Sequence, residues 1–223
     1  IHAWTAESPT LYRCIVELGE DTFVTSFGFR TIRFDQNNLY INDQKVFLRG
    51  LNRHQCYPYI GYAAVDSLQE EDVRILKEEL HVNAVRTSHY PQSQSFIDAC
   101  DRYGLYVFTE IPGWQHIGDE TWKQQAIRNT EDMVLQYRNH PSIILWGVRI
   151  NESLDDDELY AKTNEVARNL DPTRPTAGVR YLTKSHLLED IYTFNDFSHH
   201  GDNKGALSKT EVMVDTHHPL IIS

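Results

Sequence analysis

Short apolar runs alternate with amphipathic stretches over most of this chain. Between the runs, apolar residues recur at the three- and four-residue spacing of a helix that buries one face. This alternation is typical of β-α repeats around a parallel sheet. Seven runs are predicted to be strands of that sheet: 46–48, 84–85, 105–108, 143–146, 177–179, 191–194 and 220–222.

Four helices are predicted between these runs. Ser67, with Glu70 three residues later, predicts a capping box at the start of the first helix. Gly104 is placed to end the second, and a proline follows each of the third and fourth. A short fifth helix is predicted around Leu187 and Leu188.

The first 34 residues have a different pattern. The segments 11–18 and 23–29 are rich in β-branched and aromatic residues, and Gly19-Glu20-Asp21 separates them as a turn. A second hairpin is indicated around Asn42-Asp43. We therefore expect two parts: all-β structure in residues 1–34, and an α/β domain in residues 35–223.

Seven strands in residues 35–223 fit a (β/α)8 TIM barrel that is incomplete at its C-terminal end, because a whole barrel needs about 250 residues. A doubly wound open sheet is the alternative. The phosphate-binding G-x-G-x-x-G that often opens such folds does not follow the first predicted strand.

Composition excludes some functions and leaves others open. The chain has 21 Lys and Arg against 32 Asp and Glu, a formal net charge of -11, which argues against a nucleic acid partner. No apolar run approaches the roughly 20 residues that cross a bilayer. The three cysteines are widely spaced, and we expect buried thiols rather than disulfides. Ile1 at the start and an apolar run at Ser223 suggest a fragment, so the cellular compartment stays open.

Catalytic groups of a β/α barrel lie at the C-terminal ends of its strands. Polar residues follow five of the runs, in the segments 49–54, 86–90, 110, 151–152 and 195–196. Glu110 and Glu152 are a carboxylate pair of the kind that glycosidases use as acid/base and nucleophile. A strand-end glutamate can equally be a structural acceptor for an arginine.

Several of these segments carry family motifs. Residues 48–54 (LRGLNRH), 83–91 (NAVRTSHYP) and 138–153, from RNHPS through Trp146 to Asn151-Glu152-Ser153, resemble the barrel of glycoside hydrolase family 2, which includes β-galactosidases, β-glucuronidases and β-mannosidases. Trp4, the segment 7–12 and the segment 27–30 resemble the end of the immunoglobulin-like sandwich domain that precedes that barrel. The resemblance implies a retaining β-glycosidase.

Residue by residue, the resemblance implies an acid/base role for Glu152 and a hydrogen bond from Asn151 to the sugar 2-hydroxyl. His54 and His89 match histidines that contact sugar hydroxyls, although an isolated histidine is more often a satisfied core residue. Arg86 matches the arginine that keeps the nucleophile carboxylate ionised, and a structural salt bridge is its alternative role.

The resemblance gives Glu110 a place in the wall of the sugar site rather than the role of nucleophile. The nucleophilic glutamate of the family follows the seventh strand and is expected directly after Ser223, so we expect this chain alone to be inactive. One residue more than expected separates Trp146 from Asn151, which predicts a β-bulge that keeps Glu152 facing inward.

No cofactor is expected. The magnesium ligands of the large bacterial galactosidases, a glutamate and a histidine, correspond here to Trp114 and His116, and magnesium prefers oxygen ligands. Trp114 could instead stack on a sugar, or simply pack in its loop. The adjacent pairs His199-His200 and His217-His218 point to opposite faces of an extended backbone and favour solvated loops over a metal site.

Three functions remain open. A β-galactosidase that acts on a β-linked sugar is preferred, because His54 and His89 suit a neutral, hydroxyl-rich sugar. A β-glucuronidase or other family 2 glycosidase is the first alternative, and a noncatalytic carbohydrate-binding barrel is the second. An unpaired edge on the seventh strand would favour self-association, so a homo-oligomer is compatible with the sequence.

Overall fold

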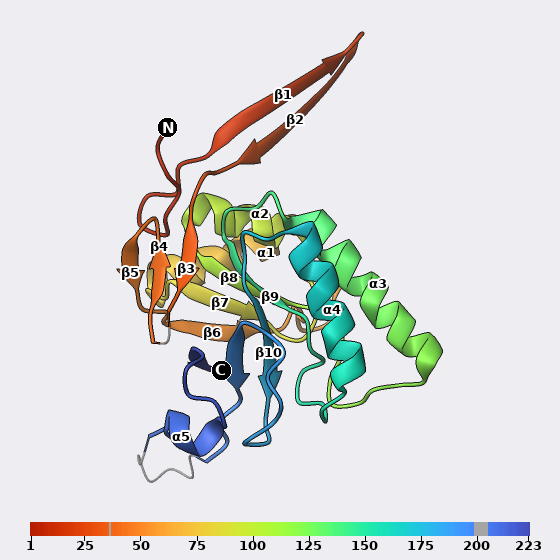
Figure 1. Cartoon of the computed structure of the whole chain (residues 1–223). Coiled ribbons are helices and arrows are strands. Elements are labelled where there is room, and N and C mark those ends of the chain that lie inside the picture. Colours follow the sequence, from red (N-terminus) through yellow and green to blue (C-terminus); the bar gives the residue numbers. More distant parts are fainter. Residues whose placement is uncertain (36, 199–204) are drawn as a thin grey trace.

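A seven-stranded parallel sheet forms the centre of the computed structural model, which describes residues 1–35, 37–198 and 205–223. Neighbouring strands follow one another in chain order, from β6 to β12 (Figure 1). The strands are β6 (Gly50–Arg53), β7 (Ala84–Thr87), β8 (Tyr106–Glu110), β9 (Ile143–Gly147), β10 (Thr176–Arg180), β11 (Ile191–Phe194) and β12 (Leu220–Ile222). This arrangement fits successive strands of a β/α barrel.

Six of the seven predicted strands are confirmed, and the first is wrong. The run predicted at 46–48 lies at the end of an antiparallel strand, β5 (Gln44–Val46), whereas the first strand of the parallel sheet is β6. The error has a clear physical cause. β6 has the sequence Gly-Leu-Asn-Arg and buries only Arg53, so it lacks the apolar run that marks a strand covered on both faces.

The two edges of the sheet face each other across a cavity. Leu48, Leu51 and other residues of β6 and its approach line one side, and Ile221 and Ile222 of β12 line the other. The sheet is therefore curled rather than flat. Within the described residues, β6 and β12 each pair with a neighbour on one side only.

Helices cover the outer face of this sheet (Figure 1). They are α1 (Asp66–Arg74), which continues into the π-helix η1 (Ile75–Glu79), α2 (Gln94–Tyr103), α3 (Glu120–Tyr137) and α4 (Asp157–Leu170), with the short α5 (Lys209–Val212) near the C-terminus. Asp119 and Asp156 cap α3 and α4 through hydrogen bonds from Trp122 N and Leu159 N.

Two details of the helix predictions are wrong and one is confirmed. Ser67 does not cap α1, because that helix begins at Asp66 after Val65, with no side-chain cap. Leu187 and Leu188 lie in a loop before β11 rather than in a helix. Gly104 ends α2 with a left-handed φ of 78°, as predicted, since a glycine adopts that conformation without a Cβ clash.

A bulge shapes the inner layer of the barrel. The pairing of β8 with β9 passes from Val107–Ile143 to Phe108–Leu145, which leaves Ile144 as an extra residue. As a result, Ile144 and Leu145 both pack on the inner face with Tyr106 and Phe108, whereas Val107 and Ile143 face the helices.

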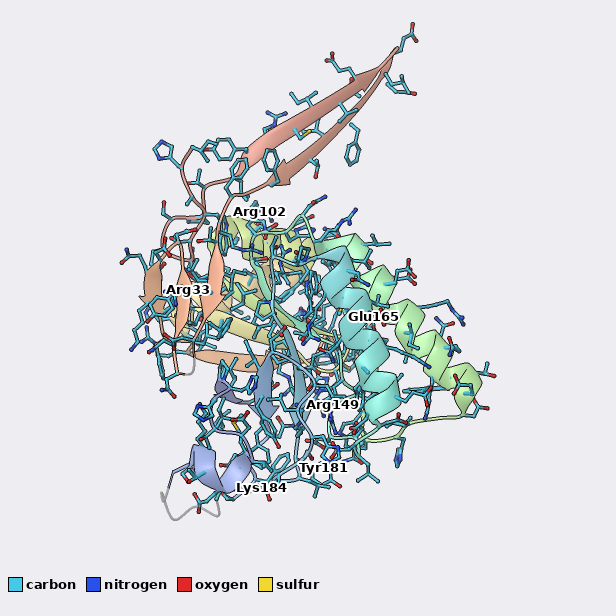
Figure 2. All side chains as sticks on the ribbon, viewed as in Figure 1. Arg33, Arg102, Arg149, Glu165, Tyr181 and Lys184 are labelled. Atoms are coloured by element: carbon cyan, nitrogen blue, oxygen red, sulfur yellow. The ribbon has the colours of Figure 1, made fainter. Side chains whose placement is uncertain are left out.

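The N-terminal residues form two small antiparallel units. β1 (Tyr12–Leu18) and β2 (Asp21–Phe27) make a hairpin that projects away from the barrel, with solvent beside both faces (Figure 2). β3 (Ile32–Phe34), β4 (Leu39–Ile41) and β5 form a second sheet, turned at Asn42-Asp43 through positive φ values of 49° and 62°. Both predicted hairpins are confirmed.

The division of the chain after residue 34 stays a prediction. β3 lies before that boundary and pairs with β4 after it. Trp4 also joins the N-terminal segment to the barrel, because its indole N–H donates to Asp101 O at 2.8 Å and its buried ring packs edge-on against Tyr106. The segment before residue 34 is therefore anchored on both sides of the β1–β2 hairpin, since Arg30 also donates to Pro141 O and Ile143 O at 3.0 and 2.7 Å.

Some smaller expectations have mixed outcomes. Cys100 is buried as expected, but Cys56 is exposed and Cys14 partly exposed, and all three are free thiols. His199 and His200 lie outside the described residues, whereas His217 and His218 are both exposed. None of the helices in the described part of the chain is long and apolar enough to cross a membrane.

Candidate active site

Glu152 lies just beyond the C-terminal end of β9 on an irregular stretch of backbone. Val148 N donates to Ala177 O and Glu152 N donates to Val179 O, at 2.9 and 3.0 Å. Four residue steps in this segment thus match two steps of β10, so the segment bulges out between its two anchors. Glu152 itself has a left-handed φ of 56°. The bulge that the extra residue before Asn151 predicted is therefore present.

Three nitrogen atoms donate hydrogen bonds to the Glu152 carboxylate. Asn195 Nδ2 contacts Oε1 at 2.6 Å, whereas Trp114 Nε1 and Gln115 Nε2 contact Oε2 at 3.1 and 3.2 Å. Burial of Glu152, only 8% exposed, would by itself raise its pKa. The three hydrogen bonds and the nearby His89 outweigh burial and lower the pKa below its usual value, which favours the ionised form.

The side-chain amide of Asn151 makes hydrogen bonds within the protein through its oxygen, whereas its N–H donor remains unused. Its Oδ1 accepts from Arg86 Nη2 at 2.6 Å and from Asn195 Nδ2 at 3.4 Å. Its Nδ2 is buried and has no hydrogen-bond partner. A buried donor without a partner costs about 1–3 kcal/mol, so the arrangement is suited to a ligand that supplies an acceptor there.

Arg86, from β7, lies at the centre of the polar contacts of the site. Its Nε donates to Glu110 Oε1 in a buried ion pair, and its Nη1 donates to Ser223 Oγ at 2.6 Å and to Asn195 Oδ1 at 3.2 Å. His89 Nδ1 lies 3.1 Å from Arg86 Nη2 and 3.4 Å from Glu110 Oε2. One guanidinium therefore joins the ends of β7, β8, β11 and β12.

The remaining predicted residues lie at the rim. The His54 ring stands edge-on to the His89 ring at 5.2 Å between centroids, and its Nδ1 lies 3.5 Å from the Tyr90 hydroxyl. Burial lowers the pKa of His54, with further lowering from His89 and Arg86, which favours the neutral ring. Trp114 is 58% exposed apart from its contact with Glu152, and His116 is exposed.

The structure thus brings all seven predicted site residues together at the C-terminal ends of the parallel strands. Arg86 contacts Asn151, Glu110 and His89, and Trp114 contacts Glu152. Asn195 joins these two groups, and His54 adds its ring beside that of His89. Glu110 is 1% exposed, and both of its oxygens are engaged by Arg86 and His89.

Two residues of the site were not predicted. Asn195 was visible as the polar residue that ends the sixth predicted strand, but no role was given to it, because an amide carries no titratable group. Gln115 lies between Trp114 and His116, the two positions that were compared with magnesium ligands, and was given no role of its own. The positive φ of 63° at Gln115, which directs its side chain, has no sequence signal.

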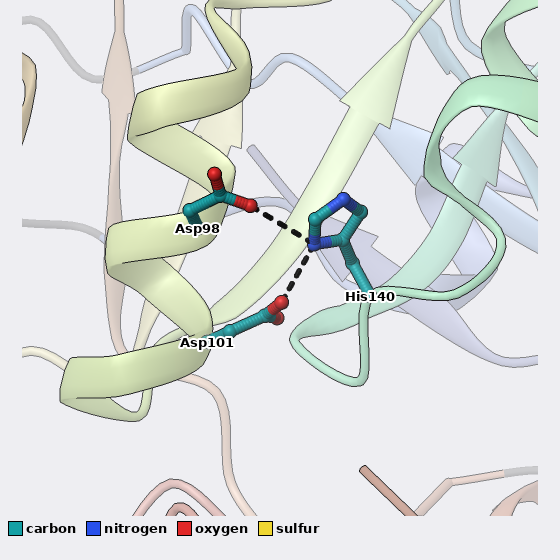
Figure 3. A group of neighbouring side chains, drawn as sticks. All are labelled: Asp98, Asp101 and His140. Atoms are coloured by element: carbon teal, nitrogen blue, oxygen red, sulfur yellow. Dashed lines mark hydrogen bonds and ion pairs between the residues drawn. The ribbon is translucent and has the colours of Figure 1, made fainter. Parts of the chain in front are cut away.

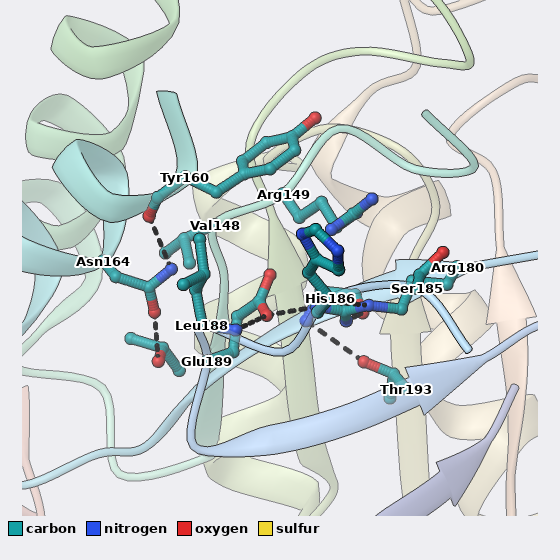
Figure 4. A network of polar contacts seen from close by, with 12 residues as sticks. Val148, Arg149, Tyr160, Asn164, Arg180, Ser185, His186, Leu188, Glu189 and Thr193 are labelled. Carbon is teal, nitrogen blue, oxygen red and sulfur yellow. Dashed lines mark hydrogen bonds and ion pairs between the residues drawn. The ribbon is translucent and has the colours of Figure 1, made fainter. Parts of the chain in front are cut away.

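A second layer of residues supports the bulge that carries Glu152, and Figure 4 shows two of its members, Arg149 and Tyr160. The buried Arg149 guanidinium donates from Nη2 to Asp155 Oδ1 at 2.6 Å and to Ser153 O at 3.3 Å, and it lies over the Tyr160 ring. The Tyr160 and Ser153 hydroxyls are 2.5 Å apart. These contacts hold the backbone on both sides of Glu152.

A fully buried ion pair lies next to this layer. Arg180 Nη2 donates to Glu189 Oε2, and neither side chain is exposed to solvent. Gly178 of β10 allows the close approach, because a Cβ at this position would lie 2.6 Å from Glu189 Oε1 and would clash with Arg149. The absence of a side chain at Gly178 therefore makes room for Arg149 and Glu189.

One group of metal-type ligands occurs among the described residues, away from Glu152. Asp98, Asp101 and His140 place their ligand atoms within 4.8 Å of one another (Figure 3). His140 Nδ1 lies 2.6 Å from Asp101 Oδ2, and Asp101 Oδ1 accepts from Ser142 N at 3.0 Å. His140 and Ser142 precede β9, so the group lies at the opposite end of this strand from Glu152, where it ties α2 to the loop before β9.

Known proteins resemble this chain closely. The family model "Glycosyl hydrolases family 2, TIM barrel domain" matches residues 32–223. A β-galactosidase of Thermoanaerobacterium thermosulfurigenes is 53% identical over 216 residues, covering 95% of this chain and 30% of that protein. The chain spans less than a third of the length of the curated β-galactosidases that it matches at 53% identity.

Solved structures show the same architecture. The apo structure of β-glucuronidase 3 from Bacteroides uniformis has a TM-score of 0.77 and 32% identity, covering 87% of this chain and 27% of that one. A β-galacturonidase from Eisenbergiella tayi, bound to galacturonate, has a TM-score of 0.79 and 30% identity, covering 87% of this chain and 37% of that one.

Proposed function

Because the chain belongs to glycoside hydrolase family 2, we propose that it provides the sugar site and the acid/base residue of a retaining β-glycosidase, with a β-galactoside as the preferred substrate. The observation that carries the proposal is the contact set of Glu152 and Asn151 at the C-terminal edge of the sheet. A buried carboxylate lies beside a buried amide whose donor has no partner in the protein.

In this proposal Glu152 protonates the glycosidic oxygen as the bond to the sugar breaks, and later accepts a proton from the attacking water. Asn151 Nδ2 donates to the sugar 2-hydroxyl, a hydrogen bond that strengthens as charge develops at the sugar ring. Arg86 Nη2, which donates to Asn151 Oδ1, fixes the orientation that this requires. His54 and His89 contact other hydroxyls.

We place the nucleophilic glutamate directly after Ser223. Ser223 Oγ accepts from Arg86 Nη1 at 2.6 Å, so the end of β12 lies beside this guanidinium, whose charge would favour the ionised form of a carboxylate placed near it. A retaining enzyme needs its two carboxyl groups about 5–5.5 Å apart. An eighth strand between β12 and β6 would complete a (β/α)8 barrel, with β1 and β2 as the end of an immunoglobulin-like domain.

A neutral sugar is preferred to a uronic acid for an electrostatic reason. Arg86 is the buried cation in contact with Asn151, and Glu110 already neutralises it. A sugar carboxylate would compete with Glu110 for the same charge. The β-glucuronidases and β-galacturonidases among the structural relatives make a uronic acid the second candidate substrate.

We further propose that no magnesium binds at Glu152. Trp114 Nε1 donates a hydrogen bond to Glu152 Oε2, and an indole N–H offers no lone pair to a cation. Magnesium prefers oxygen ligands in an octahedral arrangement, which this contact opposes. Hydrolysis should then be insensitive to EDTA.

Hydrolysis of a panel of aryl β-glycosides by the full-length protein tests the function. The β-galactoside should give the highest kcat/KM, and Glu152→Gln should lose activity toward substrates whose leaving group needs protonation. A preference for the β-glucuronide would establish the second candidate. A full-length protein that binds galactose but hydrolyses none of the panel would be a carbohydrate-binding barrel. The 223-residue chain by itself should not turn over any of them.

A further inference from the structure

The two oxygens of the Glu152 carboxylate differ in their surroundings. Oε1 accepts from Asn195 Nδ2 at 2.6 Å, and Asn195 is 7% exposed. Oε2 accepts from Trp114 Nε1 and Gln115 Nε2 at 3.1 and 3.2 Å, and both of these side chains are exposed. One oxygen thus faces the protein interior, and the other faces the exposed loop that follows β8.

All three partners are donors, so together they fit the ionised carboxylate. A protonated carboxyl has to donate from one oxygen, and an N–H directed at that oxygen would then oppose the proton. The acid form of Glu152 is therefore favoured when one oxygen loses its donors. The choice between the two oxygens depends on which donors can turn away.

Asn195 is fixed, because its own Oδ1 accepts from Arg86 Nη1 at 3.2 Å and the side chain is enclosed. Trp114 and Gln115 are anchored through their backbone, since Gln115 N donates to Asn151 O at 2.7 Å and Trp114 forms a bridge with Asn151. Their exposed side chains can rotate while the loop stays in place. The donors of Oε2 are therefore the ones that can leave.

We propose that Trp114 and Gln115 are positioning residues that select the protonation state of Glu152, and that Oε2 is the oxygen that carries the proton. This inference rests on the proposed function. When both side chains donate to Oε2 they hold the general-base form. When the aglycone occupies the space beside Oε2 and displaces them, the general-acid form becomes available.

The proton balance of the cycle follows from this assignment. In the first step the Oε2–H bond breaks and the proton goes to the glycosidic oxygen, which keeps the electron pair of the broken C1–O bond and leaves as an alcohol. C1 bonds to the nucleophilic carboxylate. In the second step water attacks C1, and its proton goes back to Oε2, while the nucleophile regains its electron pair.

The pH dependence of kcat/KM in the full-length enzyme tests the proposal with an unactivated alkyl or phenyl β-glycoside. Trp114→Phe and Gln115→Met each remove one donor and keep a similar volume. The alkaline limb, which reports loss of the proton from Glu152 in the free enzyme, should move to higher pH by roughly half to one unit in each variant. Gln124→Met is the matched control, because Gln124 also donates to a carboxylate, Glu120 Oε1 at 2.7 Å, on the exposed face of α3.

A merely structural role for Trp114 and Gln115 would lower kcat/KM equally at every pH, and an unmoved alkaline limb in both variants overturns the proposal. A limb that moves to lower pH overturns it as well. Glu152→Gln separates this inference from the proposed function. If that variant keeps wild-type activity on the unactivated substrate, Glu152 is not the acid/base and the proposed function fails first. If it is inactive while the limbs stay fixed, only the inference about Oε2 fails.

Discussion

Arg86 and Glu110 form an ion pair in which both side chains are almost completely buried, 5% and 2% exposed. Removing one member leaves the other as an unpaired buried charge, which typically costs about 3–5 kcal/mol. Arg86→Met should therefore lower the free energy of unfolding by about this amount in urea titrations. The double variant Arg86→Met, Glu110→Leu should lose less than Arg86→Met alone, and a larger loss would contradict this account.

Asp171 should make the free energy of unfolding depend on pH in the acid range. Burial would raise its pKa, but the charge of Arg174 and hydrogen bonds from Thr173 and Arg174 outweigh burial and lower it. Trp146 Nε1 also donates to Asp171 Oδ2 at 3.0 Å. Because the pKa is lower in the folded state, the contribution is complete above the unfolded pKa of about 4 and is lost as the pH falls through the folded pKa.

Urea unfolding at several pH values between about 5 and 2 checks this expectation. Asp171→Asn should be less stable than the wild type at pH 7, and its stability should change less over that pH range. Equal slopes for the two proteins would mean that Asp171 does not carry the effect.

The pKa values of two histidines should be shifted in opposite directions. His54 has its pKa lowered from 6.5, first by burial and then by His89 and Arg86, whereas His186 has its pKa raised by the hydrogen bond and charge of Asp157. Two-dimensional NMR of the imidazole nitrogens should give a midpoint below 6.5 for His54 and above it for His186. His186 acts as the internal control, and a reversed order would refute the assignment.

Gly178→Ala should disturb the residues that support the backbone around Glu152. The added Cβ would press on Arg149 and on Glu189 Oε1, and Arg149 holds the backbone next to Glu152 through Ser153 O. Overpacking of this kind costs about 1–3 kcal/mol. We expect reduced stability in thermal unfolding and reduced kcat in the full-length enzyme. Gly19→Ala, in the exposed hairpin turn with open space around the new Cβ, should leave kcat unchanged.

Much of the fold could be predicted because parallel strands buried on both faces have uninterrupted apolar runs. The strands β8 and β9 are buried at every position, and each was predicted within a residue or two of its ends. β6 escaped prediction because its surroundings leave three of its four residues exposed. The apolar residues just before it serve the β4–β5 hairpin, and periodicity alone does not distinguish the two uses.

The site was predictable where a motif and a strand end coincide, as at Glu152 and Arg86. The contacts that set the chemistry depend on backbone shape. Glu152 and Gln115 both adopt positive φ, and this directs their side chains toward one another. Asn195, which follows β11 and lies 43 positions further along the chain, reaches the same carboxylate. Such distances in sequence carry no local signal, so the partners of Glu152 emerge only from the folded chain.

The order of the strands in the parallel sheet has a consequence for how the protein is made. Each strand from β7 to β12 pairs with the strand synthesised just before it. A nascent chain leaving the ribosome can therefore add every new strand to an edge that already exists, without waiting for a distant segment. Each of these pairings spans one β-α unit rather than the whole domain, so assembly can proceed from the N-terminus as the chain is synthesised. Arg86 is synthesised early and would then form its side-chain contacts one after another as the later strands pair. Its contact with Ser223 would be the last to form.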